Sequence, residues 1–497
     1  MAHTRPNILF ITTDEQRFDC LGAYGNPVIR TPNLDRIAAE GVRFDRGYVQ
    51  NPMCMPSRMA MMTSRYCSEH GSNINCVGIP PHEQAHTFMH YLRDAGYTTA
   101  AVGKMHMMPK WGPFGFTYLD LVEGKSDDNN QYIDYLKAKG LNGRQREAKG
   151  EEGPFGTRTN PLLAEDTIDG FVGRRAKAWL ELWEGDHPFF LWVSFSNPHF
   201  PFDPPEPYDT MYDPADVPAP VWREGEMDHK PTQRQLQQER GYDELTEDEF
   251  RQIIAHYYGN VTLVDDQVGE LLRVLEEKGL MDNTLIAFTS DHGDHLGDHR
   301  LLHKSGVTFY DVSVRVPYLV RYPDLFPPGL VCEALVEAID LPVTFLDVAG
   351  VDKPPTMQGH SLVGLAQGDI SDWRDDAFSE IDLRINPRMH GPKDPGSRDY
   401  VAMICTRRWK YVHFPNLGIG ELYDLEEDPD ELNNLFYDSA YADKVAEMRL
   451  RLLNRFMNNQ HPHQGLRTET FRAVYDADHR PPEPIPGVTY APPEDVA

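Results

Sequence analysis

The amino-acid sequence predicts an α/β fold, with a mainly parallel sheet flanked by helices and a smaller C-terminal α+β domain built on an antiparallel sheet. Short apolar runs alternate with segments of helical periodicity over the first three quarters of the chain, which is typical of parallel α/β sheets. After about residue 375 the pattern changes to strands in which polar and apolar residues alternate. The chain has 497 residues, 40% of them hydrophobic, which is enough for two domains with proper cores.

The strands of the large sheet are expected at four apolar runs. They span residues 7–14, 97–103, 188–196 and 283–291. Continuous apolar character is typical of strands that are covered on both faces. Polar residues stand at or just beyond the ends of these runs: Asp14, Lys104 and His106, His199, and Asp291 and His292. Because ligands of parallel sheets bind beyond the carboxyl ends of the strands, we expect these side chains to share one edge.

Two helices of the large domain carry boundary signals. In TPNLDRIAAEG, Thr31 suits the N-cap, Pro32 the first helical position and Gly41 the C-terminal stop. In the second segment apolar residues recur at steps of three and four from Val261 to Leu275, and Gly279 follows. This spacing predicts an amphipathic helix that ends at the glycine.

The C-terminal region has a different organisation. Residues 400–414 alternate like antiparallel strands, and a helix is expected from about residue 440 to 458. The proline-rich end is typical of an extended arm that frays or wraps a partner subunit, so a homodimer or homotetramer is expected. We therefore predict a large domain at 1–375, a sheet-and-helix subdomain at 376–463 and an arm at 464–497. Residues 383–399 and much of 203–246 are expected to be loops that border a pocket.

Charge and composition exclude several classes of partner. The formal net charge of −29 argues against nucleic acid and against an anionic membrane surface. The sequence shows neither a signal-type segment nor a run of 18 apolar residues, so a cytoplasmic protein is expected. Its six cysteines form no C-x-x-C pair, and neither a disulfide framework nor a zinc site is indicated.

The segment NPMCMPSR places Cys54 beside Pro56 and Arg58. A helix starting at Pro56 would put the thiol just before a helix N-terminus, where the dipole and the arginine favour negative charge. That environment describes a reactive thiol of low pKa. A buried structural cysteine is the commoner case, and these residues alone leave both interpretations open.

Two carboxylates at strand ends indicate a metal site. Asp14 and Asp291 each end a strand that is otherwise apolar, and His292 follows directly. A cation shared by the two carboxylates explains this better than two separately satisfied buried residues. An Asp/Asp/His set suits Mg²⁺, Mn²⁺ or Ca²⁺, and the imidazole favours Mn²⁺ slightly.

The element Cys54-Met55-Pro56-Ser57-Arg58 resembles the C-x-P-S-R element of type I sulfatases, in which the cysteine is oxidised to formylglycine. Further blocks are similar to that family in the same order: NILFITTDEQR, TPNLDRIAAEGVRF, AVGKMH, SFSNPHFPF, YYGNVTLVDDQVG, FTSDHGDHLGDH and ELYDLEEDPDELNNL. The resemblance covers nearly the whole chain. It implies the fold of alkaline phosphatase, which agrees with the α/β prediction.

The resemblance also implies an activity, that of an arylsulfatase-like sulfuric ester hydrolase acting on a small sulfate monoester. A formylglycine-generating or equivalent maturation enzyme would convert Cys54. As an aldehyde hydrate, the residue would attack sulfur with one hydroxyl, form a covalent sulfated intermediate, and expel sulfate when the second hydroxyl collapses to the aldehyde. One divalent ion, Ca²⁺ or Mn²⁺ with Mg²⁺ as a further choice, is implied.

Site roles follow from the resemblance, position by position. The metal ligands implied are Asp14, the modified Cys54, Asp291 and His292. The catalytic residues implied are Cys54, Arg58, which would orient the hydrate, Lys104 and His106 near the hydrate, and His199 and Lys304, which would clamp the ester oxygens and assist the leaving group. Asn75, His199 and Lys304 are the implied substrate-binding residues.

Simpler interpretations apply to several of these residues. Taken without the resemblance, His199 would be a turn histidine and Lys304 a surface lysine. Asp265 and Asp266 lie in a predicted helix and are expected to cap or pack. The histidines after His292 are expected to support the ligands or to be structural, since one ion cannot bind all of them: His295, His299 and His303. Met59, Met61 and Met62 are expected in the core.

The sequence departs from the family pattern at two site positions. Position 15 is Glu, where the family usually has Asp or Gln, so Glu15 either reaches the metal with its longer side chain or does not bind it. His292 stands where arylsulfatases have Asn, and in this it is similar to phosphonate monoester hydrolases. A phosphonate monoester or phosphodiester hydrolase is therefore the alternative function, whereas Lys104 and His106 favour a sulfatase. A third hypothesis is a catalytically silent binding protein that retains the Cys54 thiol.

Overall fold

The structure is a computed structural model. It describes residues 5–459 except 76, 81–83, 85, 113, 124–129, 145–152, 186 and 386–398. The predicted arm at 464–497 and most of the predicted loop at 383–399 lie outside the described residues. The expected division at 1–375, 376–463 and 464–497 therefore stays a prediction.

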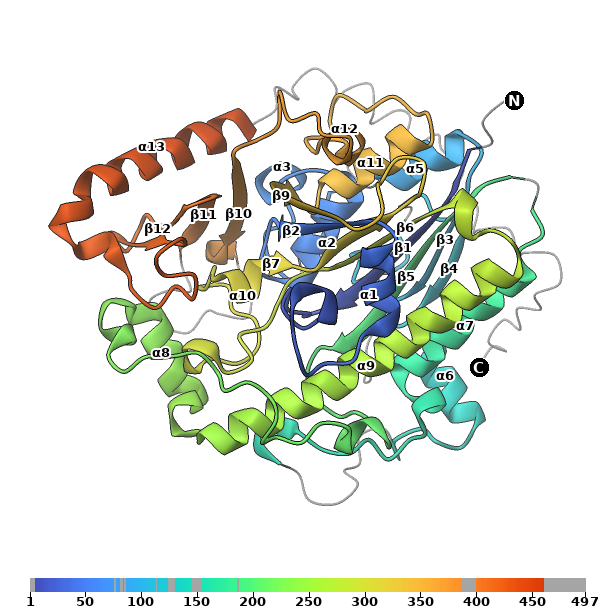
Figure 1. Cartoon of the computed structure of the whole chain (residues 1–497), viewed down its shortest axis with the longest axis horizontal. Helices are drawn as coiled ribbons and strands as arrows, with labels where there is room; N and C mark the ends of the chain where they lie inside the picture. Colours follow the sequence, from blue (N-terminus) through green and yellow to red (C-terminus); the bar gives the residue numbers. More distant parts are fainter. Residues whose placement is uncertain are drawn as a thin grey trace, which may run out of the picture.

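A nine-stranded, mostly parallel sheet forms the centre of the molecule (Figure 1). Its strands follow the order β4 (Tyr118–Leu121), β3 (Thr98–Gly103), β5 (Phe189–Pro198), β1 (Asn7–Asp14), β6 (Thr284–Ser290), β8 (Tyr318–Arg321), β2 (Val42–Tyr48) and β7 (Arg315–Val316). A ninth strand, β9 (Leu330–Glu337), pairs with β2 in parallel. The four strands expected from apolar runs are β1, β3, β5 and β6, and they are adjacent and parallel. The α/β prediction is confirmed.

Strand β1 shows why these runs are apolar throughout. Every residue of β1 is buried, and its side chains alternate between two cores. Ile8 and Phe10 belong to one apolar cluster, and Leu9 and Ile11 belong to the other. Because both faces of the sheet are covered, each position of the strand must be apolar until the strand reaches its polar edge at Asp14.

Helices cover both faces of the sheet, with α7 and α9 on one side and α5 and α11 on the other (Figure 1). The described residues before the second sheet contain the helices α1 (Pro32–Ala39), α2 (Cys54–Thr63), α3 (Cys67–His70), α5 (Phe88–Asp94), α6 (Gln131–Ala138), α7 (Ile168–Leu182), α8 (Pro231–Arg240), α9 (Glu247–Glu277), α10 (Asp311–Val314), α11 (Asp340–Val348) and α12 (Leu362–Ala366). Met59, Met61 and Met62 of α2 lie in the core, as expected.

A four-stranded antiparallel sheet follows, at the left of Figure 1. It contains β10 (Asp376–Asp382), β11 (Tyr400–Thr406), β12 (Trp409–Phe414) and β13 (Ile419–Asp424), and α13 (Ala442–Asn459) packs on it. Val445, Met448 and Leu452 of α13 lie on one helical stripe and fill the space against this sheet. The predicted antiparallel C-terminal sheet is confirmed.

One local expectation was wrong. Helix α2 begins at Cys54, not at Pro56, because Met53 takes the N-cap position with an extended backbone. Thr31 occupies the N-cap position of α1, as expected, but its side chain makes no capping bond, because its hydroxyl donates to Asp35 and accepts from Gly22 N–H. Much of 203–246 lies outside α-helices and strands, as expected, and the region contains one α-helix, α8, whose polar sequence PTQRQLQQER has no apolar stripe.

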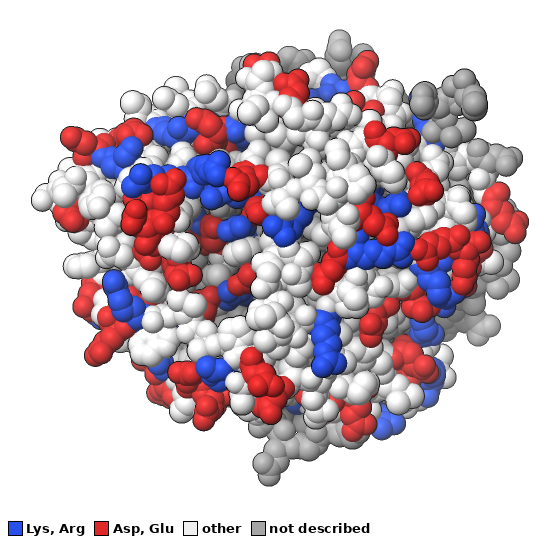
Figure 2. Space-filling view, in the orientation of Figure 1, with Lys and Arg blue, Asp and Glu red and all other residues white. Residues whose placement is uncertain are grey.

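The surface carries mixed charge. On the face in Figure 2 acidic and basic side chains are intermingled, including those on the second sheet and α13 at the left. Pairs such as Arg408 with Asp424 and Arg451 with Asp376 lie in that region. Within the described part of the chain, no helix is long and apolar enough to cross a membrane.

Candidate functional site

The carboxyl ends of four neighbouring strands converge on one site. Strands β3, β5, β1 and β6 are adjacent in the sheet and run in the same direction. Their ends, or the turns that follow, bring together the residues expected at this edge: Asp14, Lys104, His106, His199, Asp291 and His292. The juxtaposition follows from parallel pairing, because each strand delivers its last residues to the same edge.

Helix α2 supplies the remaining central residue. Cys54 is its first residue, and its thiol is buried with 1% of the residue exposed. The Cys54 Sγ lies 3.2 Å from His292 Nε2 and 3.6 Å from Asp14 Oδ1. The positive end of the α2 dipole therefore faces the group of acidic residues at the strand ends.

Four buried side chains form a candidate metal centre. One ligand atom from each of Asp14, Cys54, Asp291 and His292 lies within 4.8 Å of every other. His292 Nδ1 lies 2.9 Å from the Gly293 carbonyl oxygen. If Nδ1 carries the proton and donates it there, Nε2 keeps a lone pair directed at the other three side chains. Two carboxylates, a neutral imidazole and a thiolate fit a hard or borderline divalent ion.

Arg58 is fully buried one turn along α2 from Cys54. Its Nε donates to Asp291 Oδ2 at 2.7 Å, and one terminal nitrogen donates to Ser194 Oγ at 2.7 Å and to the Lys104 carbonyl at 2.6 Å. These bonds tie α2 to β6, to β5 and to the turn after β3. A lysine could not make this set, because it lacks the planar fork of the guanidinium.

Lys104 and His106 approach from the turn after β3. The Lys104 ammonium forms an ion pair with Asp14 Oδ2. His106 has a φ of 51°, and its backbone N–H donates to Glu123 Oε1 at 2.9 Å. This turn points the imidazole back toward Cys54, whose pKa is lowered in part by a hydrogen bond from His106.

The electrostatic balance of the site favours an anion at position 54. Burial raises the pKa of the Cys54 thiol, but Lys304, the His292 imidazolium of the metal-free site and Lys104 lower it by more, so the pKa lies well below its usual range. Burial also raises the pKa of Asp14, yet Lys104, His199 and Arg58 outweigh that effect and leave the pKa lowered overall. Both groups are held as anions by the surrounding cations.

Glu15 stands apart from the four-residue group. Its carboxylate accepts from Lys304 N–H at 2.8 Å and from Lys304 Nζ at 2.9 Å, and it lies 3.4 Å from His199 Nε2. It forms a separate cluster with Asp14 and His199. The structure therefore places Glu15 between the two residues expected to clamp the ester oxygens.

Asn75 is beside the start of α2. Its Oδ1 accepts the Met55 N–H at 3.0 Å, so the side chain supports the backbone next to Cys54. Direct contact of Asn75 with a transferred group stays a prediction.

The three histidines that follow His292 lie outside the four-residue group. His295 is close to the His303 carbonyl, and the His299 ring stacks on Tyr310 at 3.7 Å between ring centroids. His303 lies 3.8 Å from Asp294, in a cluster that includes Glu15. Asp265 has a structural role, since it accepts from the backbone N–H groups of Asn33 and Leu34 at the start of α1.

Sequence reasoning missed three residues that support the site. Glu123 accepts the backbone N–H of His106, and Ser194 accepts from Arg58. The Tyr257 hydroxyl donates to the Glu15 carbonyl at 2.6 Å. Ser194 and Tyr257 act on residues 136 and 242 positions away, and Glu123, just after β4, acts on a residue 17 positions away, so no local motif marks them.

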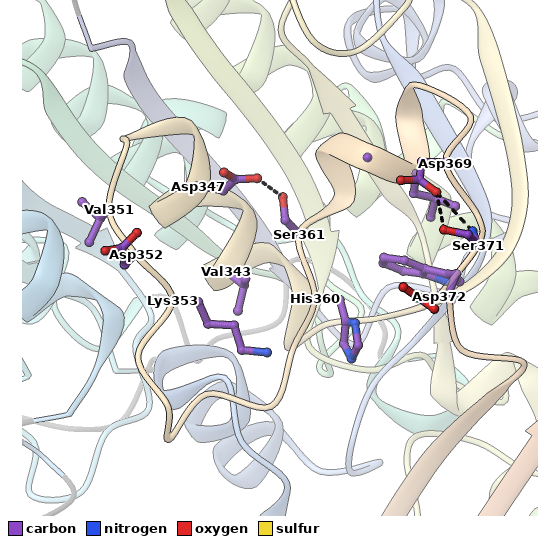
Figure 3. A pocket seen from close by; sticks show the side chains of 13 residues that line it. Val343, Asp347, Val351, Asp352, Lys353, His360, Ser361, Asp369, Ser371 and Asp372 are labelled. Carbon is purple, nitrogen blue, oxygen red and sulfur yellow. Dashed lines mark hydrogen bonds between the residues drawn. The ribbon is translucent and has the colours of Figure 1, made fainter.

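A surface pocket of about 440 Å³ lies elsewhere, between α11 and α12 (Figure 3). Its lining includes Asp347, Lys353 and His360. It contains none of the residues predicted from the strand ends. The convergent polar groups, not this pocket, therefore define the candidate site.

Two family models match the chain. The model described as Sulfatase matches residues 6–351, and the model described as N-sulphoglucosamine sulphohydrolase, C-terminal, matches residues 297–461. The first spans all the strand ends that form the site.

Individual relatives and solved structures are similar over most of the chain. An arylsulfatase of Clostridium perfringens is 32% identical over 485 residues, covering 90% of this chain and 94% of the relative. A multifunctional alkaline phosphatase superfamily protein of Trinickia caryophylli is 32% identical over 496 residues, covering 91% and 95%. The crystal structure of a phosphonate monoester hydrolase of Agrobacterium radiobacter superposes with a TM-score of 0.80 at 29% identity, covering 92% and 96%.

Proposed function

Since the chain belongs to the sulfatase family of the alkaline phosphatase superfamily and is a sulfuric ester hydrolase, we propose that it cleaves a sulfate monoester with a formylglycine made from Cys54 and with one divalent metal ion. The observation that carries this proposal is the buried group of Asp14, Cys54, Asp291 and His292 at the N-terminus of α2. Two carboxylates, an imidazole and a thiol with ligand atoms within 4.8 Å of one another form a donor set that suits a divalent ion. The same position, oxidised, would present an oxygen nucleophile to an ester.

The metal would be held by Asp14, Asp291, His292 and the modified residue 54. When bound, it would supply a Lewis acid that lowers the pKa of an oxygen nucleophile and polarises an ester oxygen. Ca²⁺ and Mn²⁺ suit this donor set, with Mg²⁺ as a third choice.

The formylglycine hydrate would supply one hydroxyl that attacks sulfur and forms a covalent sulfated intermediate, and a second hydroxyl whose collapse to the aldehyde releases sulfate. A maturation enzyme that oxidises Cys54 is therefore a necessary partner. Cys54 is buried in the folded chain, so the oxidation would have to act before this part of the protein folds completely.

The surrounding residues of the chain would orient the reactants and move protons. Arg58 would fix the position of residue 54 relative to Asp291 through its buried hydrogen bonds. His106 would accept the proton from the second hydroxyl. Lys304 and His199 would bind the ester oxygens, and one of them would protonate the departing alcohol.

A phosphonate monoester or phosphodiester hydrolase is the second candidate. The structural similarity to a phosphonate monoester hydrolase, with a TM-score of 0.80, favours it, as does a relative described as multifunctional. Both reactions pass through a tetrahedral centre with anionic oxygens, so the same residues would serve. The charged pair Lys104 and His106 near residue 54 favours the sulfate ester.

A paired rate measurement tests the proposal. The protein is co-expressed with a formylglycine-generating enzyme, loaded with Mn²⁺ or Ca²⁺, and supplied with an aryl sulfate or an aryl phosphonate monoester. Cys54→Ala provides the blank. We expect kcat/KM to favour sulfate by about a hundredfold, or about 2.7 kcal/mol of transition-state stabilisation.

The opposite preference of that size would assign the protein to the phosphonate reaction. Turnover of neither ester above the blank, with formylglycine present at position 54 by mass spectrometry, would contradict both candidates and favour a silent binding protein.

A further inference from the structure

Glu15 is the one carboxylate of the site outside the candidate metal group that touches both expected substrate clamps, among the described residues. Its backbone is firmly placed. Its N–H donates to Asp291 Oδ1 at 3.1 Å, and its carbonyl accepts from the Tyr257 hydroxyl at 2.6 Å. With a φ of 69°, the chain turns sharply after Asp14, and the two consecutive carboxylates take different partners.

The Glu15 side chain is buried and binds Lys304 at two points. One oxygen accepts the Lys304 backbone N–H at 2.8 Å, and the other accepts Lys304 Nζ at 2.9 Å. Binding the main chain and the ammonium of one residue fixes both ends of the lysine side chain. The second oxygen also lies 3.4 Å from His199 Nε2, so the same carboxylate orients the imidazole.

Each of the three site cations has a carboxylate at close distance, and Arg58 also lies 3.6 Å from Asp14. Arg58 pairs with Asp291 and Lys104 pairs with Asp14, while Lys304 pairs with Glu15. All three carboxylates are fully buried, where a charge acts over several ångströms with little screening. An uncharged residue at position 15 would leave the Lys304 charge without its partner.

We propose that Glu15 is a positioning and charge-selecting residue: it holds Lys304 and His199 in place and cancels one positive charge, so that the site prefers singly charged esters to doubly charged phosphate monoesters. This inference rests on the proposed function, because it concerns how the same site chooses its substrate. A sulfate monoester, a phosphonate monoester and a phosphodiester each carry one negative charge. A phosphate monoester carries two at neutral pH and above, and a nearby carboxylate repels the second charge.

The test compares two nitrophenyl esters on the matured, metal-loaded enzyme. The measured quantity is kcat/KM for 4-nitrophenyl phosphate divided by kcat/KM for 4-nitrophenyl sulfate. In Glu15→Gln, which keeps the shape and removes the charge, we expect this ratio to rise by about tenfold or more. In Glu15→Asp, which keeps the charge, we expect the ratio to stay within about threefold of the parent even if both rates fall.

Glu337→Gln is the matched control. Glu337 is also fully buried and pairs with cations, Arg374 and Arg455, but it lies outside the group of site residues. The ratio of kcat/KM for the phosphate to kcat/KM for the sulfate should be the same in Glu337→Gln as in the parent. An unchanged ratio in Glu15→Gln, or an equal rise in Glu337→Gln, would overturn the proposal, because a merely structural carboxylate changes both rates together.

A measurement of bound metal distinguishes a positioning role of Glu15 from a role as a metal ligand. Glu15→Gln and the parent should bind the same amount of metal per chain and with affinities within about threefold of each other. A loss of about tenfold or more in metal affinity would identify Glu15 as a ligand and overturn the proposal.

A binding measurement keeps this test independent of turnover. If the matured parent hydrolyses neither ester, the proposed function fails, and the role of Glu15 is decided by calorimetry with inorganic sulfate, a dianion. Tighter binding of sulfate to metal-loaded Glu15→Gln than to the parent, by about fivefold, would support charge selection. Equal or weaker binding would contradict it.

Discussion

Cys54 combines burial with several nearby positive charges. The residue is 1% exposed, yet Lys304, His292 and Lys104 together lower its pKa well below the usual range for a thiol. The first turn of α2 adds the positive end of a helix dipole. A site built in this way stabilises an anion on residue 54, whichever atom carries it, and therefore also an oxyanion on an oxidised side chain.

The need for two oxygens on residue 54 can be tested with Cys54→Ser. A serine hydroxyl can attack sulfur, but it has no second hydroxyl to collapse and expel sulfate. We expect a single burst of about one alcohol per active site and then a rate lower than that of the matured parent by about a hundredfold or more. Mass spectrometry should show the gain of one SO₃ group on the peptide that contains residue 54.

Cys54→Ala is the control and should give neither burst nor mass gain. Sustained turnover by Cys54→Ser at the rate of the matured parent would contradict the covalent mechanism.

A side chain of helix α9 caps the N-terminus of helix α1. Helix α1 has no side-chain cap of its own, and Asp265 in the middle of α9 takes that role. Its carboxylate accepts from Leu34 N–H at 2.8 Å and from Asn33 N–H at 3.1 Å, and also from the Asn33 side chain at 2.8 Å. Burial raises the pKa of Asp265 to about 7, against the effect of these donors. The contact fixes the start of α1 against the face of the sheet that carries α9.

Removing this cap should destabilise the protein. In Asp265→Ala the first N–H groups of α1 lose their acceptor in a buried place, and we expect a loss of about 1–3 kcal/mol in the free energy of unfolding. The midpoint of denaturant unfolding measures it. Asp266→Ala is the control, since the neighbouring residue is exposed and, among the described residues, accepts from the Tyr208 hydroxyl alone. Equal losses in the two variants would show that α1 does not depend on Asp265.

The small sheet contacts the segment of the chain that leads to Cys54. Strand β10 of the small sheet donates its Glu380 N–H to the Gln50 carbonyl, and the Glu380 carbonyl accepts from the Asn51 side chain at 2.6 Å. The Glu380 carboxylate accepts the Ser68 N–H at 2.7 Å. The small sheet thus contacts and supports the segment just before α2.

This contact predicts a pH dependence of stability. Burial raises the pKa of Glu380 to about 6 from its ordinary 4.5. The folded state therefore binds the Glu380 proton more tightly than the unfolded chain does. Protonated Glu380 stabilises the folded state below pH 4.5, and this contribution is lost as the pH rises through 6. A shift of this size corresponds to about 2 kcal/mol.

Glu380→Gln should remove this dependence. Gln is close in shape to a protonated Glu, so the two proteins should have similar unfolding free energies near pH 4. At pH 7.5 the variant should gain about 2 kcal/mol relative to the parent, measured by denaturant midpoints. A difference between variant and parent that stays constant over this range would show that Glu380 does not titrate with folding.

The strands and the strand-end residues were predictable from the sequence because they depend on local patterns. Strand β1 must be apolar at each position since the sheet is covered on both faces, and a polar Asp14 therefore marks the edge. The same reasoning placed Asp291 and, by strand adjacency, His199 and Lys104. The family resemblance supplied their expected roles, together with those of Cys54 and Lys304, which periodicity alone would not have distinguished from a core cysteine and a surface lysine.

The tertiary structure determined which residues contact one another in the site and at the helix ends. The start of α2 at Cys54, the cap of α1 by Asp265 and the pairing of Glu15 with Lys304 each join residues that are far apart in sequence or depend on the packing around them. Glu15 illustrates the reason: from the sequence it was equally a metal ligand or not, and the turn at φ 69° sends its carboxylate to Lys304. Apolar periodicity is a property of one segment, so it can be read from the local sequence. The partner of a buried charge depends on which distant segments the fold brings within hydrogen-bonding distance.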